Sequence, residues 1–233
     1  MIDRRAFIAL GVASAFARPS WAQDDADVSK VKAEVERIVA AFLEEAGAAA
    51  GGLQPPRVFV DFTPQLIWAE WPSNEVHTAT WSQCPEPLRD SIASLLGDDA
   101  PMSPSEFFYE VFNGFLVAHE MSHLVDFAHG REHAPGSLYA DEARANRAAV
   151  AFWLTQPGGR ERLSRLMGVV ETIWSRLPSP APAGADAVAY FEENYEQLGA
   201  SFEAYGWYQF RMFLDAWSAR DSNTLAEILT EGL

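Results

Sequence analysis

The chain has 233 residues, of which 48% are hydrophobic and 21% charged, so it carries enough apolar material for one globular core. Its formal net charge of −16 argues against nucleic acid as a partner, because phosphate binding needs clustered Lys and Arg. We therefore predict one domain that does not act on nucleic acid.

The first 22 residues are typical of an export signal. The adjacent Arg4 and Arg5 precede an apolar stretch, residues 9–17, that is too short to span a bilayer. Small residues at Ser20 and Ala22 predict cleavage after Ala22. We expect a twin-arginine signal, with an ordinary secretion signal as the alternative. The mature domain, 23–233, is then periplasmic or secreted and keeps no stable membrane span.

Cys84 is the only cysteine, so an internal disulfide is excluded. It precedes Pro85 near a predicted loop, and no His-rich motif accompanies it. We interpret it as a partly buried structural thiol.

The first part of the mature chain predicts a helix, a small sheet and a second helix. Apolar residues at helical spacing predict the first helix over 28–48, and the Gly51-Gly52 pair ends it. Three short runs rich in β-branched and aromatic residues predict antiparallel strands at 57–62, 66–71 and 76–81. His77 lies on the last strand, where a packed or surface role is the usual one. Because this strand is the last before the central helix, we hypothesise that it pairs with an extended substrate.

A long apolar helix follows the predicted short helix 86–96. Ser103, Pro104 and Glu106 form a capping-box start, and the apolar run continues to Gly130. Gly114 inside this helix predicts a close neighbour. Beyond it, further helices are expected at 138–156, 160–177, 185–217 (as one or two helices) and 224–229.

The long helix contains the sequence His119-Glu120-Met121-Ser122-His123, which reads H-E-x-x-H. Residues four apart lie on one helix face, so both imidazoles can hold one zinc ion. Glu120 is the candidate general base beside that zinc. The alternative is that the histidines pack in a helix interface without a metal.

A catalytic zinc site needs a third protein ligand, and two residues are candidates. His129 follows His119 by ten residues, but Asp126 occupies the position where the corresponding three-histidine motif needs a glycine. A continuous helix would carry His129 about 15 Å along the axis from His119. Glu142 begins the next helix, with Asn146 one turn later on the same face. We expect Glu142 to be the ligand and keep His129 as the alternative.

At this point the sequence resembles the gluzincin metallopeptidases, in which H-E-x-x-H is followed by E-x-x-A-D or a near variant on a second helix. The match covers Glu142-x-x-Ala145-Asn146 as well as the first motif, about thirty residues in all, and is similar to that of small secreted bacterial metallopeptidases. The resemblance implies that His119, His123 and Glu142 bind one zinc ion and that Glu120 activates a water. It also implies that Asn146 supports a ligand histidine, in place of the group's Asp.

Asp141 and Asp126 are further candidates for residues that hydrogen-bond to a metal ligand and hold it in place. The expected fold class is α+β, predominantly α and zincin-like, with a small antiparallel sheet before the central helix and a second ligand-bearing helix. The expected function is zinc-dependent hydrolysis of peptide or protein substrates. An inactive zincin-fold binding module is the competing class, and nothing in the sequence indicates an oligomeric state.

A stabiliser for the developing oxyanion is also required. Tyr205, Tyr208 and Arg211 share one predicted helix face, and His133 follows the central helix. None of the four carries a signal that separates this role from packing or surface exposure.

Overall fold

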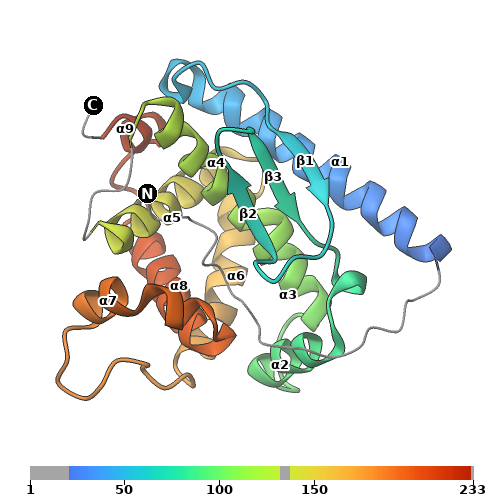
Figure 1. Ribbon diagram of the computed structural model, residues 1–233, viewed down its shortest axis with the longest axis vertical. Coiled ribbons are helices and arrows are strands. Elements are labelled where there is room, and N and C mark those ends of the chain that lie inside the picture. The colour runs from blue at the N-terminus through green and yellow to red at the C-terminus, as the bar shows by residue number, and fades with distance from the viewer. Residues whose placement is uncertain (1–20, 132–136, 232–233) are drawn as a thin grey trace.

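A computed structural model describes residues 21–131 and 137–231 of the chain (Figure 1). The fold is α+β and predominantly helical, with one three-stranded sheet, as expected. The predicted export signal and His133 lie outside the described residues, apart from Trp21 and Ala22, which begin the first helix. Within the described ranges, no helix is both long and apolar enough to cross a membrane.

The predicted helices are confirmed, with most ends shifted by a few residues and the first helix beginning at Trp21 instead of residue 28. They are α1 Trp21–Ala46, α2 Glu86–Leu96, α3 Pro104–Glu110, α4 Leu116–Ala128, α5 Leu138–Thr155, α6 Gly159–Trp174, α7 Ala187–Gly199, α8 Phe202–Ser218 and α9 Leu225–Thr230. Short 3₁₀ turns, η1 Gly47–Ala50 and η2 Trp81–Gln83, follow α1 and the sheet.

The sheet consists of β1 Arg57–Val60, β2 Ile67–Glu70 and β3 Glu75–Thr78, in the order β1-β3-β2. The β2–β3 pair is antiparallel, but β1 runs parallel to β3, so the predicted antiparallel sheet is in fact mixed. The chain leaves β1, passes the position of β3 and enters the sheet at the far edge. Four-residue strands fix neither their neighbours nor their direction from sequence alone.

β3 is the central strand, with partners on both sides. Its backbone groups are used within the sheet, so the hypothesis that this strand pairs with a substrate is wrong. The edge strand next to the central helix is β2, which packs against α4, while β1 packs against α1 (Figure 1).

The long helix predicted from Ser103 onward is present, but it contains a π-helical turn, η3 Val111–Phe115, between α3 and α4. Ser103 and Glu106 form the predicted capping box. In the π-helical turn the Asn113 amide donates to Thr78 Oγ1 at 2.8 Å and to the Ala79 carbonyl at 3.0 Å. These two bonds attach the buried helix to the end of β3.

Gly114 has the close neighbour that the sequence predicted. A Cβ atom at this position would lie 2.7 Å from Nη2 of Arg162 on α6. The Arg162 guanidinium lies 4.2 Å from the ring centre of Trp153, which places a cation over an aromatic face. Helix α5, which carries Trp153, packs against both α4 and α8.

Candidate metal site

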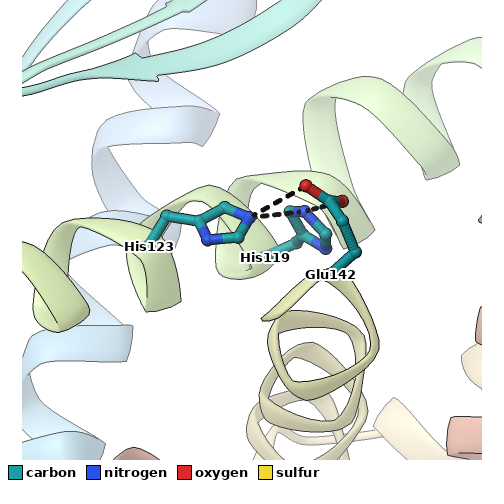
Figure 2. A group of neighbouring side chains, drawn as sticks. All are labelled: His119, His123 and Glu142. Carbon is teal, nitrogen blue, oxygen red and sulfur yellow. Dashed lines mark hydrogen bonds and ion pairs between the residues drawn. The ribbon is translucent and has the colours of Figure 1, made fainter. Parts of the chain in front are cut away.

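Three side chains from two helices converge on one point (Figure 2). His119 and His123 come from successive turns of α4, and Glu142 comes from the first part of α5. The two Nε2 atoms lie 3.1 Å apart, and the Glu142 oxygens lie 3.3 Å from His119 Nε2 and 3.7 Å from His123 Nε2. All three residues are buried.

These distances fit a zinc ion. Two ligand atoms about 2.1 Å from a tetrahedral zinc lie about 3.4 Å from each other. The three observed separations, 3.1, 3.3 and 3.7 Å, bracket that value. Without a cation, one imidazole must donate a proton to the other across the 3.1 Å contact.

Charge coupling between the ligands opposes the effect of burial. Burial acts to lower the pKa of His119, but the hydrogen bond and negative charge of Glu142 outweigh it and leave that pKa raised. Burial likewise acts to raise the pKa of Glu142, but the hydrogen bond and charge of His119 outweigh it and hold that pKa well below its ordinary value. Glu142 is therefore an ionised, buried carboxylate at neutral pH.

Asn146 contacts His119, one of the candidate ligands. It is fully buried on α5, and its Oδ1 lies 3.0 Å from Nδ1 of His119. Metal-binding histidines usually donate the other ring N–H to such an oxygen, which fixes the ring and its tautomer.

Gln209 on α8 is a site residue that the sequence reasoning missed. Its Nε2 donates to Glu142 Oε2 at 2.7 Å, and its Oε1 accepts from Asn146 Nδ2 at 3.2 Å. Gln209 thus touches one ligand and the partner of another. The sequence signal was weak: Gln209 is a polar residue in the aromatic-rich stretch Trp207 to Phe213, which also contains Arg211.

Glu120, the candidate base, is buried and accepts a 2.9 Å hydrogen bond from the backbone N–H of Ala69 on β2. This contact ties the motif to the edge strand of the sheet.

A largely apolar cavity adjoins the site and is partly open to solvent. His119, Glu120 and Glu142 line one side of it. The apolar wall comes from β2, the π-helical turn, α4 and α8, and includes Ile67, Val111, Phe112, Leu116, Phe202, Phe210 and Phe213.

Of the oxyanion candidates with described positions, only Tyr205 lines this cavity. Its hydroxyl accepts a 2.9 Å hydrogen bond from Gln209 Nε2. Burial, together with the charge of Glu142, raises the pKa of Tyr205 well above its ordinary value, so the hydroxyl keeps its proton. Tyr208 instead donates to the Ala187 carbonyl, and Arg211 pairs with Asp215 beside the Trp207 ring.

The structure places His129 away from the converging ligands. It caps the end of α4, and its Nε2 lies 2.9 Å from the carbonyl oxygen of Ala49 in η1. The ring also fills the space beside Gly51, where a Cβ atom would lie 2.9 Å from Cε1 of His129.

Asp141 and Asp126, the two aspartates proposed to hold a metal ligand in place, lie in an ion-pair network. Arg144 reaches Asp141 at 3.3 Å and the buried Asp126 at 2.5 Å, and Arg131 reaches Asp126 at 2.9 Å. Asp141 also accepts from the Ser137 hydroxyl. The contribution of Asp141 to metal binding stays a prediction.

A second His and Glu group, His77 with Glu70 and Glu75, lies on the other face of the sheet. The His77 ring is stacked between Trp68 and Phe59, at 4.3 and 4.9 Å between ring centres. Glu75 pairs with both His77 and Arg57. His77 is therefore a packed strand histidine, the usual role for its position.

The chain matches no protein-family model, no curated protein and no solved structure.

Proposed function

We propose that this protein is an exported zinc metallopeptidase with a zincin-like, gluzincin-type site. The observation that carries the proposal is the convergence of His119, His123 and Glu142 beside Glu120. The ligand set is one that catalytic zinc sites use, two histidines and a glutamate, with a fourth position left for a small molecule.

Zinc in such a site supplies Lewis acidity, which lowers the pKa of a water molecule and polarises a carbonyl group. The chain's own part is carried out by its carboxylates and amides. Glu120 takes a proton from the attacking water and passes it to the leaving amine. The hydrogen bond from Ala69 holds the Glu120 carboxylate toward the cavity while it does so.

The surroundings favour an extended peptide with an apolar side chain near the bond that is cut. The edge strand β2 borders the cavity through Ile67, and a peptide can add to a sheet edge, with the Ala69 N–H already bonded to Glu120 there. The apolar cavity wall favours a large hydrophobic side chain over a charged one.

Export is the part of the proposal that rests on sequence alone. The paired arginines Arg4 and Arg5, the short apolar stretch and the small residues before residue 23 support a periplasmic or secreted location. Mass spectrometry of the protein recovered from the cell envelope tests it: a chain that begins at Gln23 supports the proposal, and an intact Met1 in the cytoplasm contradicts it.

The activity is tested with residues 23–233, loaded with zinc, on a mixed peptide library read by mass spectrometry. We expect cleavage next to large apolar residues, loss of cleavage with a zinc chelator, and recovery when zinc is restored. A protein that holds zinc and binds peptides but cuts none would favour the inactive binding module instead.

A further inference from the structure

Four polar groups form a closed ring of hydrogen bonds beside the metal site. His119 Nδ1 meets Asn146 Oδ1 at 3.0 Å, and Asn146 Nδ2 meets Gln209 Oε1 at 3.2 Å. Gln209 Nε2 meets Glu142 Oε2 at 2.7 Å, and that oxygen lies 3.3 Å from His119 Nε2. The ring joins α4, α5 and α8, and all four residues are buried.

The hydrogen-bond donors and acceptors of these groups can be arranged around the ring in only one way. An ionised carboxylate only accepts hydrogen bonds, so Gln209 must turn its NH₂ group toward Glu142. Its carbonyl oxygen then faces Asn146, so Asn146 must donate a hydrogen bond to it from its own NH₂ group. The Asn146 oxygen is left for His119, whose Nδ1 must therefore carry the proton.

This arrangement of donors and acceptors decides whether His119 can bind a metal. With one proton held on Nδ1 by Asn146, the Nε2 atom faces His123 and Glu142 and is the ring nitrogen that can exchange its proton for a metal ion. If Asn146 were reversed, its NH₂ group would face Nδ1 and the proton would sit on Nε2. A protonated Nε2 cannot ligate, so the orientation of one amide controls a ligand atom.

We propose that Gln209 is a positioning residue that orients Asn146 and thereby fixes His119 in its metal-binding tautomer. The inference rests on the proposed function, since it concerns the ligands of the same site. It also accounts for an uncharged Asn at position 146. A carboxylate there would accept the His119 hydrogen bond in either orientation, whereas an amide needs Gln209 to keep its oxygen toward His119.

The test compares zinc dissociation constants, measured by competition with a chelator, for the wild type and a set of variants. Gln209→Leu removes both amide contacts and is expected to weaken zinc binding about 10- to 100-fold. Tyr205→Phe is the matched control, because it removes the other group bound by Gln209 Nε2 and leaves the ring intact. We expect it to bind zinc within a few-fold of wild type.

The rescue experiment separates orientation from packing. Asn146→Asp in the Gln209→Leu background supplies an acceptor-only group to His119, so we expect most of the zinc affinity to return. Asn146→Asp alone places carboxylates at both ends of the Gln209 amide, which can donate to only one of them, so we expect it to bind zinc less tightly than the double variant. A packing role for Gln209 predicts no rescue.

A second readout uses the metal-free protein. The side-chain amide protons of Asn146 should exchange slowly with solvent in wild type and much faster in Gln209→Leu, as seen by NMR. If wild type bound no zinc, the proposed function would fail, yet this readout would still decide whether Gln209 orders Asn146. Should Gln209→Leu fold poorly by circular dichroism, Gln209→Met, which keeps the side-chain length, carries the same expectations. Wild-type zinc affinity and slow Asn146 exchange in these variants would overturn the inference.

Discussion

The backbone N–H of Ala69 donates a 2.9 Å hydrogen bond to the Glu120 carboxylate, so the edge strand β2 and the H-E-x-x-H helix share one contact at the cavity. The bond holds a buried carboxylate that lines the same cavity as His119 and Glu142. It also allows the role of Glu120 as a base to be separated from its role in the fold.

Replacing Glu120 with Gln should abolish most hydrolysis while leaving zinc content and folding unchanged. The Gln amide oxygen can still accept from Ala69, but the side chain cannot take a proton, and loss of a general base costs about 10²- to 10⁴-fold in rate. Peptide hydrolysis and zinc content are measured together, with the exposed Glu171→Gln as control. If Glu120→Gln loses its zinc or unfolds, Glu120 is a structural residue.

The sequence was sufficient for the parts of the site that are local. His119, Glu120 and His123 follow one helical spacing, and Glu142 and Asn146 follow another, so two short segments predict five residues. Gln209 was missed because it lies 63 residues after Asn146, on a helix whose packing partner no spacing rule indicates. The order of the sheet was missed for the related reason that short strands do not specify their neighbours.

Replacing His129 with Ala should leave zinc content at the wild-type value. The side chain binds the carbonyl oxygen of Ala49 instead of the ligand group, so the change removes one hydrogen bond, worth about 1 kcal/mol of stability. Zinc analysis and a urea unfolding midpoint check both statements. Loss of zinc in His129→Ala, with the fold retained, would support the three-histidine alternative.

The stability of the zinc-free protein should depend on pH through the His119–Glu142 pair. The pKa of Glu142 is lowered, so its contribution is present above its ordinary pKa of 4.5 and is lost as the pH falls below it. The pKa of His119 is raised, so its contribution is present below the ordinary value of 6.5 and is lost as the pH rises through the raised pKa. The pair therefore stabilises the zinc-free fold most between these two values.

Zinc competes with the proton on His119, so the stabilisation that zinc adds should grow as the pH rises. Calorimetry of zinc-free and zinc-loaded protein at pH 5 and pH 8 should give the larger difference in Tm at pH 8. An equal difference at both values would mean that zinc does not displace a proton from this pair.

Cys84 should be unreactive in the native protein. Its sulfur is buried near the Thr80 carbonyl, and burial raises its pKa to about 12. At pH 8 only about one thiol in 10⁴ is then ionised, against about a quarter in an unfolded chain. Labelling with a disulfide reagent should be about 10³-fold slower in native protein than in guanidinium. Comparable rates would show that Cys84 is accessible.

The most direct test of the account is the zinc content of the mature protein and of Glu142→Ala, with the exposed Glu171→Ala as the matched control. Glu142 supplies the carboxylate that lies 3.3 Å from His119 Nε2 and 3.7 Å from His123 Nε2. We predict about one zinc per chain in wild type and in Glu171→Ala, and far less in Glu142→Ala. Absence of zinc from wild type refolded with zinc, or full zinc retention by a folded Glu142→Ala, would contradict the proposed site.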